Sequence, residues 1–113
     1  MAEKQSAAQK AIGDIAPKLA DLTDHVLFGD IWERPGLSPR DRSLITVTAL
    51  TALYRTDQLG FHLKLAMENG LSEDQLVEAI THLAFYAGWP NAIGAAGQLK
   101  SIVESAAQSA DGN

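Results

Sequence analysis

Two histidines of this 113-residue chain stand in surroundings that suit acid–base chemistry. His82 follows Glu78 by four residues, so a helix would place the carboxylate and the imidazole on one face, where they can pair. Tyr86 lies four residues further along, within the aromatic stretch 81–90. His62 falls on the apolar stripe of its own segment, where a polar group must find a partner or line a cavity. Both imidazoles are candidates for proton transfer, and a structural role at a buried helix end is the alternative for His82.

A local cluster of arginines is notable in a chain whose net charge is −5. Arg34, Arg40 and Arg42 occur close together and follow Trp32 and Glu33. Because a guanidinium group can bind a carboxylate through two parallel hydrogen bonds, this segment predicts an anion-binding mouth. The alternative is a set of surface arginines at the first turn of a helix.

Several chemistries are excluded by the residue types and spacings of the chain. It contains no cysteine, which excludes thiolate nucleophiles, Cys-x-x-Cys redox chemistry and Cys-ligated zinc. Neither His-x-x-x-His nor Glu-x-x-His occurs, so we predict no metal site. The Gly-x-Ser-x-Gly motif of serine hydrolases is also missing, and nucleophilic hydrolysis is not expected.

Charge and hydropathy limit the expected partners and location. The acidic balance argues against nucleic acid, which needs a basic face to neutralise phosphates, and against anionic membrane surfaces. The N-terminus has no apolar signal core, and no apolar run approaches the roughly 20 residues that span a bilayer. We therefore expect a cytoplasmic protein that binds neither nucleic acid nor membrane.

Apolar residues recur at helical spacing through most of the chain and predict an all-α fold of five or six helices. Ser38-Pro39 and Ser72-Glu73-Asp74-Gln75 are strong helix starts, and the second is a capping box. The helix that follows Ser38 is apolar nearly all round, so we expect it to be central and buried on most faces. The expected segments are 11–22 with Pro17 starting, ending or kinking a helix, a short helix or turn in 24–36, and helices over 38–54, 56–70, 72–88 and 91–106.

The domain organisation follows from the same pattern. Residues 1–9 are polar and alanine-rich, and we expect them to be flexible. Residues 10–107 are expected to form a single domain. The polar segment 108–113 is expected to be a disordered tail.

Four segments, in this order along the chain, resemble the 4-carboxymuconolactone decarboxylase family: Gly29 to Ser38 (GDIWERPGLS), Arg40 to Leu44 (RDRSL), Phe61 to Leu63 (FHL) and Thr81 to Pro90 (THLAFYAGWP). The resemblance covers roughly residues 20–105. It implies an alkylhydroperoxidase D-like helical subunit in a ring-shaped homohexamer, a trimer of dimers, with sites near subunit contacts. It also implies a lyase that needs no cofactor and removes CO2 from 4-carboxymuconolactone, giving 3-oxoadipate enol-lactone in protocatechuate breakdown, the beta-ketoadipate pathway.

One departure from the wider superfamily is informative. Its alkylhydroperoxidase D-like members carry Cys-x-x-Cys followed by x-x-x-His. Counting back from His62 places Gln58 and Arg55 at the two cysteine positions. Thiol peroxidase chemistry cannot operate without these thiols, so the chain resembles the decarboxylase-type branch.

Loss of CO2 from such a substrate moves charge through a double bond to the lactone oxygen. The protein then needs cations to hold carboxylates, donors for the oxyanion and an acid that protonates carbon. We expect Arg42 and Arg34 to contact a carboxylate or the oxyanion, and His82 or His62 to donate the proton or a hydrogen bond. Glu33 is expected to orient an imidazole or to relay the proton.

Three aromatic residues are expected to exclude water from this pocket: Trp32, Tyr86 and Trp89. Two other functions remain open at this point. The first is a related cofactor-free enzyme that acts on another small acid or lactone. The second is a non-catalytic helical oligomer that binds a small molecule, in which the histidines and Glu33 do not converge on one cavity.

Overall fold

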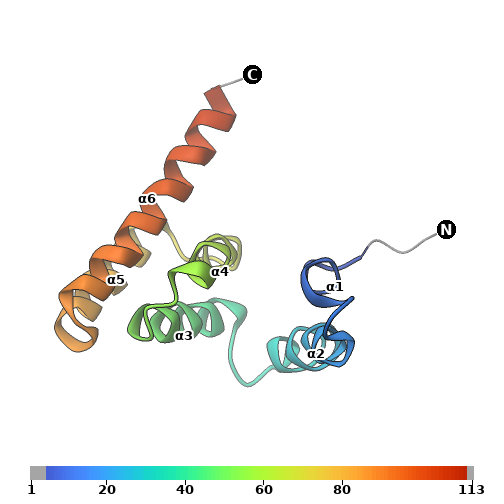
Figure 1. The fold of residues 1–113 in the computed structure, drawn as a ribbon. Helices are drawn as coiled ribbons and strands as arrows, with labels where there is room; N and C mark the ends of the chain where they lie inside the picture. The colour runs from blue at the N-terminus through green and yellow to red at the C-terminus, as the bar shows by residue number, and fades with distance from the viewer. Residues whose placement is uncertain (1–4, 112–113) are drawn as a thin grey trace. The chain divides into compact units, whose positions relative to one another are not determined.

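The computed structural model describes residues 5–111, and its regular secondary structure over that range is entirely helical (Figure 1). Six α-helices and two short turns of other helical types are present, which confirms the all-α prediction. Two compact units make up these residues, and the chain passes from one to the other between Pro39 and Arg40. A single domain over residues 10–107 stays a prediction, because this division does not decide whether the units fold separately. Among the described helices, none has the length and apolarity needed to cross a membrane.

The first unit contains α1 (Ala7–Ile12), α2 (Pro17–Leu22), the π-helical turn η1 (Thr23–Leu27) and the 3-10 turn η2 (Ile31–Glu33). Pro17 begins α2, where its missing N–H costs nothing, so the expected 11–22 segment is two helices. Ser6 caps α1 by accepting a hydrogen bond from the Gln9 amide (3.0 Å) and donates one to Asp24 (2.7 Å). Residues 7–9, expected in the flexible N-terminus, thus form the first turn of α1; residues 1–4 lie outside the described range.

The second unit contains α3 (Pro39–Ala52), α4 (Thr56–Glu68), α5 (Glu73–Ala87) and α6 (Trp89–Asp111), of which α6 packs against both α4 and α5. Its core is made of aliphatic side chains, and each fully buried leucine contributes roughly 2 kcal/mol. The buried core residues are Val47, Leu59, Leu63, Ala66, Leu71, Leu76, Ile80, Ala92, Ala95, Leu99 and Ile102.

The expectation that the 38–54 helix is central and buried on most faces is wrong for the single chain. Only Ser43, Val47 and Thr51 are buried on α3, while Ile45 and Leu53 are exposed. The physical reason is that α6, rather than α3, lies between two other helices of the core. The remaining apolar surface of α3 therefore faces outward from the protomer.

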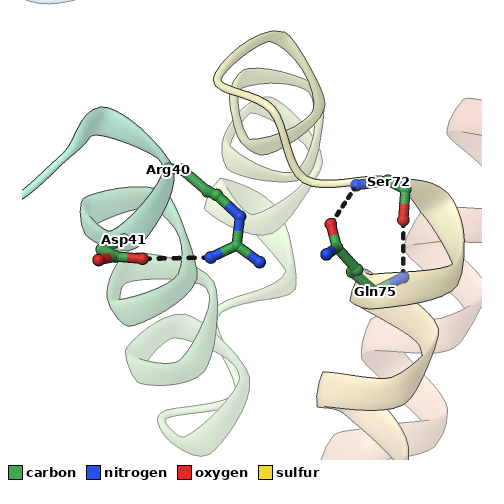
Figure 2. A network of polar contacts seen from close by, with 4 residues as sticks. All are labelled: Arg40, Asp41, Ser72 and Gln75. Carbon is green, nitrogen blue, oxygen red and sulfur yellow. Dashed lines mark hydrogen bonds and ion pairs between the residues drawn. The ribbon is translucent and has the colours of Figure 1, made fainter.

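Helix ends agree with the predicted signals at α5 and differ at α4 and α6. Ser72 and Gln75 form the predicted capping box at the start of α5, with hydrogen bonds of 2.9 and 3.1 Å (Figure 2). At α4, expected over residues 56–70, Arg55 occupies the cap position and the helix ends at Glu68.

The last helix is longer than expected. It begins at Trp89 with Pro90 in its first turn, because Gly88, at φ 101°, turns the chain and leaves Pro90 where no N–H is required. The sequence predicted a start near Asn91 and a disordered tail from residue 108. Instead α6 continues to Asp111, and only residues 112–113 of that predicted tail lie outside the described range.

Candidate functional site

A groove of about 580 Å³ between α3 and α5 contains two of the predicted site residues, His82 and Tyr86. It lies within the second unit, with α3 and α5 as its two helical walls. Aliphatic side chains line it together with groups that can carry charge or donate hydrogen bonds. The lining residues are Arg40, Leu44 and Thr48 of α3, Leu71 before α5, and Gln75, Glu78, Ala79, His82, Leu83 and Tyr86 at or within α5.

The α5 wall presents Glu78, His82 and Tyr86 on successive turns, as their spacing of four residues predicts. The imidazole of His82 stacks on the Tyr86 ring, with 4.9 Å between ring centroids and 26° between planes. Both side chains are exposed in the groove. Within residues 5–111, neither Glu78 nor His82 makes a side-chain hydrogen bond, so the pairing of these two side chains predicted from sequence is not formed.

The α3 wall contributes a cation, Arg40, which belongs to the arginine cluster predicted from the sequence but was given no specific role there. Its side chain extends from α3 toward the first turn of α5, where Gln75 lies (Figure 2). Its Nη1 donates to Asp41 at 3.2 Å. Arg40, Leu44 and Thr48 are spaced by four residues, which is the signal that could have assigned this arginine to the groove.

Arg42 and His62 are not among the lining residues of this groove. At roughly 100° of rotation per helical residue, Arg42 points about 200° away from Arg40 around α3, and its side chain is half-buried. His62 is also half-buried, on α4, with its ring edge-to-face against Phe61 at 4.9 Å. Burial lowers the pKa of His62 below its ordinary value of 6.5, because a charged imidazole is less well solvated there.

Trp89 lies on another surface of the second unit. Two shallow depressions of about 310 and 290 Å³ adjoin one another between α5 and α6, and Trp89 lines the second. Its indole packs edge-to-face against Phe85, with 5.2 Å between centroids. Sequence reasoning grouped Trp89 with Tyr86, whereas the structure places the two on different hollows.

The remaining predicted residues belong to the first unit. Trp32 and Glu33 are in η2, and Arg34 follows it as the C-terminal cap residue. Trp32 stacks on Phe28, with 5.8 Å between centroids and 26° between planes. Glu33 and Arg34 are exposed. Among residues 5–111, no group of three or more His, Asp or Glu side chains is arranged to hold a metal ion.

Comparisons with known proteins give one family match and two relatives that are named decarboxylases. Residues 17–101 match the carboxymuconolactone decarboxylase family. The chain is 38% identical over 79 residues to 4-carboxymuconolactone decarboxylase of Acinetobacter baylyi, covering 70% of this chain and 59% of that protein. It is also 38% identical over 73 residues to nitrosuccinic acid decarboxylase npaB of Metarhizium robertsii, covering 65% of this chain and 51% of that protein. The chain therefore spans between half and two thirds of the length of these relatives.

Proposed function

Because the chain belongs to the carboxymuconolactone decarboxylase family, we propose that it is a carboxy-lyase that needs no cofactor. The observation that carries the proposal is its equal identity to two proteins that are both named decarboxylases. The α3–α5 groove supports it, since the groove combines a guanidinium, an imidazole and a phenol on an apolar floor. These are groups that can hold a carboxylate and move a proton.

The first substrate proposed is 4-carboxymuconolactone. The electron pair of the breaking bond to CO2 moves through the ring double bond to the carbonyl oxygen of the lactone, which gives a furanolate. Protonation of ring carbon then yields 3-oxoadipate enol-lactone. The substrate accepts the electron pair itself, so the chain has to supply only binding groups, a donor for the oxyanion and an acid.

His82 is the proposed acid, because it stands in the groove beside the Tyr86 ring without a hydrogen-bond partner among residues 5–111. Tyr86 is the proposed cover, since its ring limits the access of water. His62 stays a candidate hydrogen-bond donor, and its lowered pKa favours the neutral imidazole at neutral pH. Arg42, with the first-unit and aromatic residues predicted from sequence (Trp32, Glu33, Arg34 and Trp89), is part of the same proposal.

A second substrate, nitrosuccinate, is favoured by the match to the Metarhizium robertsii protein. A nitro group can accept the electron pair from the breaking carbon–carbon bond as a nitronate, so this compound also needs no separate electron acceptor. The two reactions therefore require the same types of protein group. A related small acid or lactone with a built-in electron acceptor fits the same site.

The proposal includes a cytoplasmic homo-oligomer, a ring-shaped hexamer built as a trimer of dimers. Its support is the apolar surface around α5 and α6, where Phe85, Ile93 and Trp89 are 73%, 63% and 57% exposed. Adjoining apolar side chains exposed to this extent are typical of an interaction surface.

The direct test is turnover by the purified full chain of 4-carboxymuconolactone and, separately, of nitrosuccinate, followed by CO2 release. We expect turnover of at least one compound. Replacing the acid in His82→Gln is expected to lower kcat by about 10²- to 10⁴-fold, the usual contribution of a general acid. The matched control is His25→Gln, which removes an exposed imidazole of the first unit. No release of CO2 from either compound would contradict the assigned substrates and favour a non-catalytic binding oligomer.

A further inference from the structure

The α3–α5 groove carries its charge at separate places. Arg40 contributes the permanent positive charge on the α3 wall, and Glu78 contributes the negative charge on the α5 wall. Figure 2 shows the Arg40 guanidinium between α3 and the first turn of α5, where Gln75 lies, with Nη1 turned toward Asp41. His82 lies seven residues further along α5, which corresponds to roughly 10 Å at 1.5 Å per residue. The cation and the proposed acid therefore stand at two levels of one groove.

We propose that Arg40 binds the carboxylate that the substrate retains, and that it thereby orients the leaving carboxylate away from the cation and along the groove. This inference rests on the proposed decarboxylase function and deepens it. It assigns a binding residue that the family resemblance did not single out, and it gives the groove a direction, with the retained group at Gln75 and the reacting carbon near His82.

The chemistry of the reaction explains why the cation belongs to the retained group. A guanidinium bound to the leaving carboxylate stabilises the substrate and loses that interaction as CO2 departs neutral, so it raises the barrier. A guanidinium bound to a carboxylate that keeps its charge binds substrate and transition state equally. Gln75 and His82 are roughly 10 Å apart along α5, so a substrate that spans this spacing fits the second arrangement.

The Arg40 guanidinium can bind a substrate carboxylate in addition to its contact with Asp41. Its ion pair with Asp41 joins exposed side chains, 41% and 50% accessible, and such pairs contribute little stability. The guanidinium has five N–H donors, and within residues 5–111 its hydrogen bond to Asp41 uses Nη1 alone. A carboxylate in the groove can therefore bind at Nη2 and Nε with little loss elsewhere. Glu78 repels an anion further along, which favours the Arg40 level for the retained charge.

The test separates binding from turnover. The probe is (5-oxo-2,5-dihydrofuran-2-yl)acetate, which is 4-carboxymuconolactone without its leaving carboxyl group, and its methyl ester is the uncharged counterpart. Calorimetry on the full chain is expected to show that Arg40→Gln weakens binding of the acid by about 10- to 100-fold, as for hydrogen bonds to a charged group, and leaves binding of the ester unchanged. Arg40→Lys should fall between the two because it keeps the charge without the two-pronged donor.

The matched control is Arg55→Gln, which also removes one exposed arginine that pairs with a neighbouring aspartate, Asp57, and lies outside the groove. In steady-state kinetics with 4-carboxymuconolactone, Arg40→Gln is expected to raise KM by the same factor while kcat stays within about threefold, the pattern of uniform binding. Equal loss of the acid and the ester, or no loss beyond that of Arg55→Gln, overturns the assignment. Absence of turnover with a selective loss of acid binding would refute the decarboxylase and leave the carboxylate site standing.

Discussion

Burial gives His62 a different chemical character from a histidine in water. Its pKa lies below 6.5 because the half-buried ring on α4 loses solvation when it is charged. Folding therefore favours the neutral imidazole, and the unfolded chain binds a proton at a higher pH than the folded chain does. The stability that this difference contributes is present above pH 6.5 and is lost as the pH falls from there through the folded-state pKa.

The lowered pKa of His62 predicts how the substitution His62→Gln changes the pH dependence of stability. Between about pH 8 and about pH 5, the free energy of unfolding of the unmodified chain should fall more steeply than that of His62→Gln, because only the former takes up this proton on unfolding. Urea denaturation at each pH measures the difference. A direct check is the NMR titration of the His62 ring in the folded chain against the same ring in urea. A folded-state midpoint equal to or above the unfolded one would contradict the prediction.

Some of the side-chain positions could be predicted from the sequence, and others could not. The pairing of His82 with Tyr86 was predictable because four residues make about one helical turn, so the two rings had to share a face. The sequence did not show which of Arg40 and Arg42 lines this groove, and the role proposed for Arg42 stays a prediction. Side chains two positions apart on a helix point in nearly opposite directions. Of these two arginines, Arg40 is the one that lines the groove.

At the scale of the elements, α6 holds the second unit together through small residues and one amide. Asn91 donates to the carbonyl of Ala52 at the end of α3, at 3.0 Å, and to Ala87 at 3.1 Å. Gly94 lies under the ring of Tyr54, a residue with the unusual φ of 57°. A small residue at this position of α6 therefore allows the close approach of the Tyr54 side chain.

Two glycines of α6 provide a matched pair of substitutions. Gly97→Ala should stabilise the chain by about 0.5–1 kcal/mol, because alanine favours the helix and no atom lies within 4 Å of the added Cβ. In Gly94→Ala the new Cβ would lie 3.2 Å from Tyr54 Cε1 and 3.4 Å from Thr56 Cγ2, so displacement of these groups should cancel most of that gain. Urea denaturation of both variants measures the difference. Equal stabilisation would show that Tyr54 moves freely.

At the scale of the whole molecule, the family match crosses the boundary between the two compact units. It runs from residue 17 to residue 101, while the units divide at Pro39. Predicted site residues belong to both units, with Glu33 and Arg34 in the first and His62 and His82 in the second. The apolar surface of α5 and α6 is exposed in a single protomer, and this exposure supports the proposed assembly.

The proposed assembly can be tested with charge placed on that surface. Phe85→Asp combined with Ile93→Asp should shift the chain to a smaller species in sedimentation velocity, because the two carboxylates would have to be buried on association. The control, Ser101→Asp combined with Ala107→Asp, adds the same charge at exposed positions of α6 that do not line the two depressions. A monomeric unmodified chain, or an equal shift in both double variants, would contradict an interface on this surface.

The sequence by itself determined the helical class, the capping box at Ser72, and the common face of His82 and Tyr86. All of these depend on contacts within a few residues, which spacing and residue type specify directly. Only the tertiary structure decided that α6 takes the central place expected of α3, that Trp89 and Tyr86 face different hollows, and that Arg40 meets the α5 wall. Those outcomes depend on which helix faces compete for one core, and periodicity within a single helix does not contain that information.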